Sequence, residues 1–209
     1  ARKLGSSLVA TNLGKALASE VFRQLPRETR LLVYCWRGGE RSHSAAHIFS
    51  RVGWHAARLD GGYKAYRAAV QRALYKGQAV AGLRFALLNG PTGSCKSAIL
   101  ETIHSSGHQV LDLEALAGHR GSAFGSFFVK NFDDSMPAVI PQPSQKAFES
   151  NLLMQLLQFD KQRVIFVESE SARIGRIQIP RAVHSQVIAA EAGFFELRVP
   201  LQLRVHHLR

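Results

Sequence analysis

One stretch of the sequence places a cysteine among glycines and arginines just before a helical pattern. It reads Cys35-Trp36-Arg37-Gly38-Gly39-Glu40-Arg41-Ser42 and follows a short apolar run, Leu31–Tyr34. Backbone N–H groups at a helix start, together with two arginine charges, favour a thiolate over a thiol. We therefore expect Cys35 to be a nucleophile in an anion cradle; a buried structural cysteine is the alternative. The predicted cradle consists of Arg37, Gly38, Gly39, Arg41 and Ser42.

A second stretch, Gly90-Pro91-Thr92-Gly93-Ser94-Cys95-Lys96-Ser97, lies between the apolar run Leu83–Leu88 and an apolar helix start at Ala98. This context is typical of a phosphate-binding loop, in which backbone N–H groups surround phosphates and a lysine reaches their terminal oxygens. Cys95 departs from the pattern, which has glycine before the lysine, and a side chain there could weaken binding. An ordinary glycine turn is the alternative. The predicted phosphate-binding residues are Gly90, Gly93, Ser94, Lys96 and Ser97.

Further charged residues follow other predicted elements. Glu168 and Glu170 come directly after the strand-like run Val164–Val167, where a phosphate-loop protein holds a magnesium ion or its water. Magnesium is therefore compatible with the sequence, although the spacing defines no complete set of metal ligands. Other candidates for contact with an anionic substrate or metal-bound group are His119, Arg120, Arg173 and Arg176; for each of these, a solvated loop position is the alternative.

Apolar periodicity predicts alternating strands and helices around these stretches. The expected strands cover residues 31–34, 55–59, 83–88, 109–113, 164–167 and 194–199. The expected helices cover residues 11–24, 42–53, 63–75 and 181–190, with two more starting at Ala98 and after an N-cap at Ser144. In the helix after Ser144, a predicted core stripe holds Phe148, Leu152, Leu153, Leu156 and Leu157. Residues 117–125 and 129–143 are expected to be irregular. This alternation indicates an α/β protein with parallel sheets and a boundary at Lys76-Gly77, giving domains 1–76 and 77–209.

Composition limits the classes of protein that fit. The 209 residues are 46% hydrophobic, enough for a packed core, and the formal net charge is +12. Residues 1–76 hold 14 of the 27 Lys and Arg but only 4 of the 15 Asp and Glu. A basic surface beside a nucleophile suggests a polyanion such as RNA; a merely soluble basic surface is the alternative. Two unpaired cysteines within motifs, without a leader or membrane span, predict a cytoplasmic location.

The cysteine stretch, followed by Gly61-Gly62-Tyr63-Lys64-Ala65-Tyr66-Arg67, resembles the rhodanese-type region of bacterial tRNA 2-selenouridine synthases. The phosphate-binding loop downstream makes the resemblance specific, although Ser169 stands where the family has aspartate. The resemblance implies the C-terminal part of a rhodanese-like domain followed by a P-loop NTPase-like parallel-sheet domain. It also implies an earlier rhodanese portion before residue 1 and further helices after residue 209.

The activity implied by the resemblance is a tRNA-modifying transferase. It replaces sulfur by selenium in wobble 2-thiouridine, through a geranylated intermediate, with selenophosphate and geranyl diphosphate as co-substrates. Cys35 would be the nucleophile or the selenium carrier. Alternatives are a rhodanese-type sulfurtransferase, a cysteine-dependent phosphatase using Cys35 and Arg41, and a degenerate, non-catalytic tRNA-binding fragment.

Overall fold

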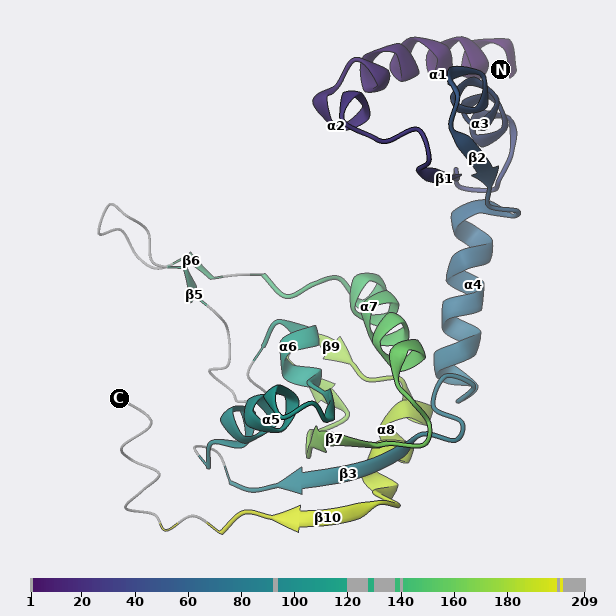
Figure 1. The fold of residues 1–209 in the computed structure, drawn as a ribbon. Coiled ribbons are helices and arrows are strands. Elements are labelled where there is room, and N and C mark those ends of the chain that lie inside the picture. Colours follow the sequence, from purple (N-terminus) through teal and green to yellow (C-terminus); the bar gives the residue numbers. More distant parts are fainter. Residues whose placement is uncertain are drawn as a thin grey trace. The chain divides into compact units, whose positions relative to one another are not determined.

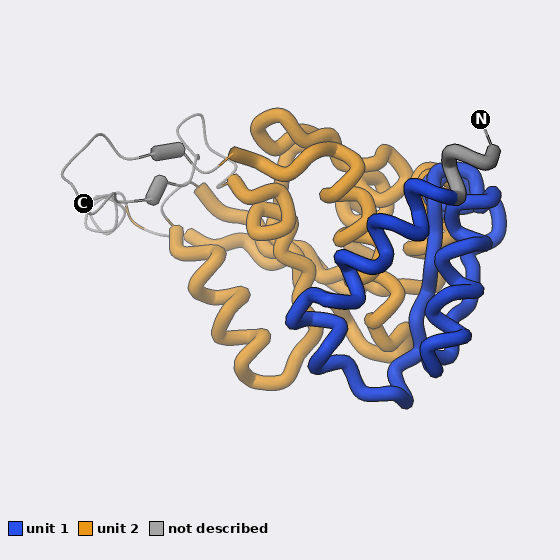
Figure 2. The backbone as a smooth tube through the Cα atoms, turned by 90° about the horizontal axis from the view of Figure 1, so that it is seen from above, with its two compact units in different colours: residues 1–69 blue, residues 70–209 orange. Residues whose placement is uncertain are grey.

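A computed structural model describes residues 2–91, 94–119, 128–129, 138–139, 141–198 and 200 of the chain (Figure 1). The chain folds into two compact units, residues 1–69 and residues 70–209 (Figure 2). They divide inside one helix, α4 (Gly62–Tyr75). The boundary predicted after Lys76 falls later on the chain, just past the end of this helix. Each unit is an α/β structure with a parallel sheet, as the alternation of patterns predicts.

The first unit is built on a strand, helix, strand crossover. Strands β1 (Arg30–Val33) and β2 (His55–Arg58) pair in parallel, and α3 (Glu40–Val52) connects them. The ring of Phe49 on α3 is buried and stacks on Phe22 with ring centroids 5.3 Å apart. Gly53 ends α3 in the left-handed region, at φ 118°, which confirms the stop predicted there.

The helix expected over residues 11–24 is wrong in its bounds. The structure has α1 (Arg2–Leu17) followed by the short α2 (Glu20–Arg23). Ser19 separates them because its backbone is extended, with φ −71° and ψ 153°, and it is the N-cap residue of α2. The apolar spacing continues across Ser19, so the pattern alone could not show the break.

The second unit contains a four-stranded parallel sheet in the order β10-β3-β7-β4, of which Figure 1 labels the first three strands. Its strands are β3 (Arg84–Asn89), β4 (Gln109–Leu111), β7 (Val164–Glu168) and β10 (Gly193–Glu196). Strand β3 pairs directly with β7, so Leu88 lies opposite Glu168. Because parallel strands end at the same edge of a sheet, the residues following β3, β7 and β4 meet there.

Helices cover this sheet and complete its core. Helix α5 (Lys96–Ser105) packs against β4 and β7, and α8 (Arg181–Ala189) packs against β3. Helix α7 (Gln145–Gln158) starts as predicted, since the Ser144 hydroxyl accepts a hydrogen bond from the Ala147 N–H. The fully buried side chains include Phe85, Leu100, Leu111, Phe148, Leu152, Ile165, Val167 and Val183. Burial of each large apolar side chain stabilises the fold by about 2 kcal/mol.

Three predictions for the second unit need correction. The strand expected over residues 109–113 ends at Leu111, because the Asp112 carboxylate caps α6 (Leu113–Ala117) by accepting the Ala115 N–H at 2.8 Å. The last strand ends at Glu196 rather than Val199. Leu157 was expected in the core but is 67% exposed, because the buried face of α7 follows Phe148, Leu152 and Leu156.

Two short antiparallel pairings were not predicted, and the first of them lies at the segment expected to be irregular over residues 129–143. Strands β5 (Phe128–Val129) and β6 (Ala138–Val139) pair antiparallel, and β8 (Arg173–Ile174) and β9 (Ile177–Gln178) form a hairpin. The remainder of the loop expected over residues 117–125 lies outside the described residues from Arg120 onward. Across the described part of the chain, every helix is too short or too polar to cross a membrane.

Candidate functional site

The loop after β1 holds Cys35 at the start of α3. Its Sγ lies 3.4 Å from the Ser42 Oγ and 3.9 Å from the Gly39 carbonyl oxygen. Ser42 is buried, and its single hydroxyl hydrogen is donated either to the Gly39 carbonyl oxygen at 2.9 Å or, when Cys35 is a thiolate, to the sulfur. The sequence-predicted cradle residues Gly39 and Ser42 therefore surround the sulfur. The exposed arginines Arg37 and Arg41 lie on the same loop and first helical turn.

Hydrogen bonding in this loop favours the thiolate form. Partial burial raises the pKa of Cys35, but bonds from the Ser42 hydroxyl and from the N–H groups of Ser42, Arg37 and Gly39 outweigh it. Together they lower the pKa from the ordinary 9.0 to about 6. In most molecules Cys35 is therefore a thiolate at pH 7. A nucleophile, or an acceptor of a transferred group, needs this form.

The turn before α4 holds the cysteine loop in place from its other side. The Tyr63 N–H donates to the Cys35 carbonyl oxygen at 2.9 Å, and the Lys64 N–H donates to the Trp36 carbonyl oxygen at 3.0 Å. A Cβ at Gly62 would lie 2.1 Å from the Cys35 carbonyl oxygen and 2.4 Å from the Gly38 nitrogen. Glycine at this position lets the two loops touch backbone to backbone. These bonds turn the carbonyl groups of Cys35 and Trp36 toward α4, while the N–H groups of Arg37, Gly39 and Ser42 lie near the sulfur.

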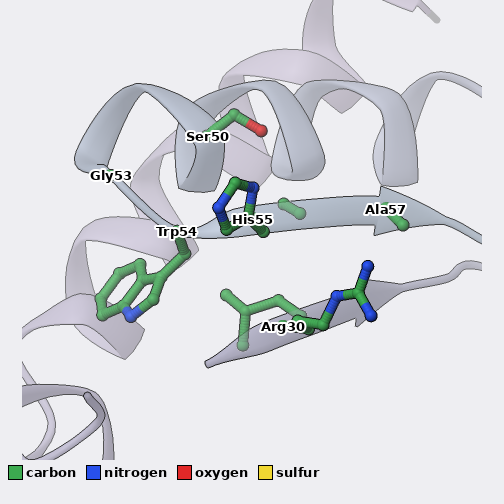
Figure 3. A pocket seen from close by; sticks show the side chains of 8 residues that line it. Arg30, Ser50, Gly53, Trp54, His55 and Ala57 are labelled. Atoms are coloured by element: carbon green, nitrogen blue, oxygen red, sulfur yellow. The ribbon is translucent and has the colours of Figure 1, made fainter. Parts of the chain in front are cut away.

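An open groove of about 580 Å³ lies elsewhere in the first unit (Figure 3). Arg30, Trp54 and His55 line it at the amino ends of β1 and β2. Cys35 follows the carboxyl end of β1, so the groove is at the opposite end of these strands. No cysteine or carboxylate is among its lining residues, and the groove is not part of the thiolate site.

The loop after β3 leads into α5, as a phosphate-binding loop does. The Lys96 ammonium donates to the carbonyl oxygens of Gly90 and Pro91 at 3.0 and 3.5 Å, so it lies over the loop. Ser94 is buried, and its hydroxyl has no hydrogen-bond partner among the described residues. Ser97 is exposed on the first turn of α5, and Gly93 lies outside the described residues. An unsatisfied hydroxyl beside a lysine and a helix N-terminus suits an anionic ligand.

Cys95 takes the left-handed conformation that the motif reserves for glycine. Its φ and ψ are 60° and 28°, and it is the N-cap residue of α5 without a capping hydrogen bond from its side chain. A residue with a Cβ is strained in this region by about 1 kcal/mol. The departure from the motif therefore leaves the start of α5 in place and introduces strain at Cys95.

Three carboxylates gather at the sheet edge beside this loop. Ligand oxygens of Glu114, Glu168 and Glu170 lie within 4.8 Å of one another. Glu168 is only 1% exposed, and its Oε1 has no partner among the described residues. Burial raises the pKa of Glu168, as do the charges of Glu170 and Asp112, whereas Lys96 lowers it. Burial and the charges of Glu168 and Glu170 also raise the pKa of Glu114. Lys96 thus offsets only part of the effect of burial and of the neighbouring carboxylates on Glu168.

A divalent cation fits this donor set. Carboxylate oxygens are the ligands that magnesium prefers, and it usually takes one or two of them together with phosphate oxygens and waters. The unpartnered Glu168 oxygen and the mutual repulsion of the three carboxylates are what such an ion would relieve. Glu114, Glu168 and Glu170 are therefore the residues that could hold it.

Glu114 is a member of the carboxylate cluster that the sequence alone did not indicate. Glu168 and Glu170 were recognised because they follow an apolar strand directly. Glu114 follows β4, and β4 pairs with β7 in parallel, with Leu111 opposite Val167. The available signal was an acidic residue shortly after a second apolar run, but the order of the strands decides whether the two ends are neighbours.

The remaining predicted residues are placed differently. His119 is buried, and its backbone N–H donates to the Glu114 carbonyl oxygen. The ring Nδ1 of His119 has no partner among the described residues. The Arg173 side chain donates to the Gly175 carbonyl oxygen at 2.9 Å and ties its own hairpin together. Arg176 is exposed, while its backbone N–H donates to the Gln142 side chain at 2.7 Å. Arg120 lies outside the described residues.

Fold and site together define a class: an α/β protein in which a unit bearing a loop thiolate precedes a P-loop domain. Comparison with known proteins narrows this class, because residues 83–209 match the profile of the AAA domain of tRNA 2-selenouridine synthases. The chain belongs to the tRNA 2-selenouridine synthase family. The resemblance seen in the cysteine and phosphate-loop motifs is thereby confirmed.

Individual relatives extend the similarity over nearly the whole chain. The tRNA 2-selenouridine synthase of Nitrosomonas europaea is 33% identical over 99% of this chain and 50% of its own length. Those of Shewanella frigidimarina and a Sulfurovum species are 34% and 32% identical over 98% and 97% of this chain, and over 51% of their own lengths. The chain therefore spans about half the length of these relatives. No solved structure matches it.

Proposed function

We propose that this chain acts in a tRNA-modifying transferase that replaces sulfur by selenium in wobble 2-thiouridine through a geranylated intermediate. The main support for this proposal is that one chain combines a Cys35 thiolate with a phosphate loop and a carboxylate cluster. The relatives named tRNA 2-selenouridine synthase supply the reaction class. In this proposal residues 1–76 are the C-terminal part of a rhodanese-like domain.

The phosphate loop suits the geranylation step. The sulfur of the thiouridine attacks the first carbon of geranyl diphosphate, and the carbon–oxygen bond breaks with its electron pair going to the diphosphate. Lys96, the Ser94 hydroxyl and the N-terminus of α5 would hold the diphosphate and stabilise its developing charge. A magnesium ion, held by Glu114, Glu168 and Glu170, would supply further charge neutralisation when bound.

The thiolate loop suits the exchange of sulfur for selenium. In one path the Cys35 thiolate adds to C2 of the geranylated base, and geranylthiolate leaves with the carbon–sulfur electron pair and takes up a proton. Hydrolysis of selenophosphate provides selenide and phosphate, and the selenide then displaces Cys35 from C2. Arg37, Arg41 and the loop N–H groups would stabilise the anions in these steps. Oxidation states do not change, so no oxidant is needed.

Mass spectrometry of tRNA nucleosides tests this function. Thiolated tRNA is incubated with the protein, geranyl diphosphate and selenophosphate, and S-geranyl-2-thiouridine and 2-selenouridine are quantified. We expect Cys35→Ser to stop selenation while geranylated uridine accumulates, and Lys96→Ala to stop geranylation. Glu101→Gln, an exposed carboxylate elsewhere on α5, is the matched control and should retain both steps.

Two outcomes would contradict the proposal. Selenation that continues in Cys35→Ser would remove the cysteine from the reaction. Unchanged thiouridine, together with Cys35-dependent release of phosphate from an aryl phosphate, would favour a cysteine-dependent phosphatase, in which Cys35 and Arg41 hold the phosphoryl group.

A further inference from the structure

Four aromatic side chains cluster around the cysteine loop, two of them exposed and two half-buried. Tyr34 and Trp36, the residues on either side of Cys35, are 58% and 52% exposed. Both rings contact Tyr63, with centroid distances of 6.5 and 5.6 Å, and Tyr66 continues the row at 6.0 Å from Tyr63. We call these four residues the aromatic cluster. Grouped exposed rings are unusual on a protein surface and mark binding sites.

Backbone hydrogen bonds fix this cluster relative to the reactive sulfur. The Tyr63 and Lys64 N–H groups donate to the carbonyl oxygens of Cys35 and Trp36, so α4 holds its tyrosines against the loop. The Cys35 Sγ instead contacts Gly39 and Ser42 at the start of α3. Within the three residues Tyr34, Cys35 and Trp36, the rings therefore contact α4 and the sulfur contacts the start of α3. A ligand bound to the rings would lie close to the sulfur.

Charge around the cluster indicates the kind of ligand. Arg37, Arg41 and Lys64 are exposed on the same loop and helix starts. The first 76 residues carry 14 Lys and Arg against 4 Asp and Glu. Aromatic rings interleaved with cations bind single-stranded nucleic acid, because bases stack on the rings while the cations meet the phosphates. Stacking on such rings needs a base that is unpaired.

We propose that the aromatic cluster stacks an unpaired base next to the uridine that reacts at Cys35, and so positions the RNA strand. The inference rests on the proposed function, in which the substrate is a thiolated uridine in tRNA. The rings contact Tyr63 while the sulfur points to α3, so the stacked base is a neighbour of the reacting base. The residues responsible for positioning are Tyr34, Trp36 and Tyr63.

Tryptophan fluorescence provides a direct test. The chain has two tryptophans, so Trp54→Phe leaves Trp36 as the reporter. We expect an anticodon stem-loop RNA with an unpaired wobble 2-thiouridine to quench Trp36, and a fully paired duplex of equal length not to. Trp36→Ala should bind the stem-loop about tenfold more weakly. Phe194→Ala, which removes another 58% exposed ring from β10, is the matched control and should bind normally.

A second measurement excludes a merely structural effect of the substitution. The pH profile of Cys35 alkylation should be the same in Trp36→Ala as in the unsubstituted protein, showing that the loop is intact. If Trp54→Phe does not fold, the affinities of the unsubstituted protein and Trp36→Ala still decide the question.

The possible results separate this inference from the proposed function. Stem-loop binding without quenching and without loss in Trp36→Ala would overturn the stacking role and leave the tRNA function standing. Absence of stem-loop binding by the unsubstituted protein would instead contradict the tRNA function itself. Quenching by geranyl diphosphate in competition with RNA would assign the rings to the prenyl chain and overturn the inference.

Discussion

Cys35 and Ser42 show how two side chains seven positions apart create a reactive group. The Ser42 hydroxyl lies 3.4 Å from the sulfur and, with three backbone N–H groups, stabilises its negative charge. Ser42 is itself buried, so its hydroxyl cannot turn to bulk water. Beside the phosphate loop the opposite holds: burial and the charges of neighbouring carboxylates disfavour the charged form of Glu168, and Lys96 offsets this only in part.

Ser42→Ala should raise the pKa of Cys35 from about 6 toward its ordinary value, because one donor to the thiolate is lost. The rate of iodoacetamide alkylation at Cys35, followed by peptide mass spectrometry, should rise with pH through about 6 in the unsubstituted protein and at higher pH in the variant. Ser50→Ala, an exposed serine on the same helix, should leave the profile unchanged. An identical profile for Ser42→Ala would show that the hydroxyl does not stabilise the thiolate.

Magnesium should raise the melting temperature of the protein, because an ion bound to Glu114, Glu168 and Glu170 relieves their repulsion. Glu168→Gln should melt at an equal or higher temperature without magnesium and lose most of the increase on adding it. Scanning calorimetry with and without millimolar magnesium chloride measures both effects, with Glu101→Gln as the control. A full magnesium response in Glu168→Gln would place the ion elsewhere.

Two loop elements depend on unusual backbone conformations. In the phosphate loop, Cys95 has a positive φ where the motif uses glycine, and α5 begins regardless. In the thiolate loop, Gly62 allows the turn before α4 to touch the cysteine loop, and the N–H groups of that turn bind the carbonyl oxygens of Cys35 and Trp36. Glycine is thus not required at position 95 for α5 to begin, but it is required at position 62 for the two loops to touch.

Cys95→Gly should stabilise the protein by about 1 kcal/mol, since glycine adopts the left-handed conformation without strain. For a chain of this size the melting temperature should rise by about 2–4 °C. Cys95→Ala removes the sulfur but keeps the Cβ, so it should bring no gain. Equal melting temperatures for the glycine and alanine variants would mean that strain at this position is negligible.

Gly62→Ala should destabilise the protein by about 2 kcal/mol or more, because its Cβ would overlap the Cys35 carbonyl oxygen. The loop must then move, and the pKa of Cys35 should rise as its N–H donors shift. Urea unfolding and the alkylation profile test the two parts. Gly39→Ala is the matched control, since nothing lies within 4 Å of a Cβ there and its φ is −88°. A stable Gly62→Ala with an unchanged thiol pKa would contradict the packing argument.

Across the whole molecule, charge and chemistry are divided between the two parts of the chain. Most of the net charge of +12 belongs to residues 1–76, which also contain the thiolate loop. The acidic cluster and phosphate loop belong to the second unit. If the proposed function holds, a polyanionic substrate should bind mainly through the basic first part and a diphosphate through the second.

Salt should weaken RNA binding strongly. Each phosphate neutralised on a single strand contributes a slope of about −0.7 to the dependence of log affinity on log salt. If Arg37, Arg41 and Lys64 meet three phosphates, the affinity should fall at least about tenfold between 50 and 200 mM salt. Fluorescence anisotropy of a labelled stem-loop gives the slope, which should decrease by about 0.7 in Lys64→Gln. A slope near zero would contradict a phosphate-binding surface.

The sequence by itself determined the features that depend on neighbouring residues. The Ser144 N-cap, the Gly53 helix stop and the strand–loop–helix context of Cys35 and Lys96 were all predicted correctly, because capping, glycine conformation and apolar spacing act within a few residues. The family could be recognised from the same local motifs.

The tertiary structure decided what depends on distant segments. Glu114 joins Glu168 and Glu170 only because β4 pairs with β7, and the order of strands in a sheet is not written in either strand. The turn at Gly62 supports Cys35 through contacts across a gap of 27 positions, and Leu157 is exposed because the core faces another side of α7. The spacing of apolar residues along the chain indicates whether a segment is a helix or a strand. Which other segments that helix or strand contacts depends on the packing of the whole fold.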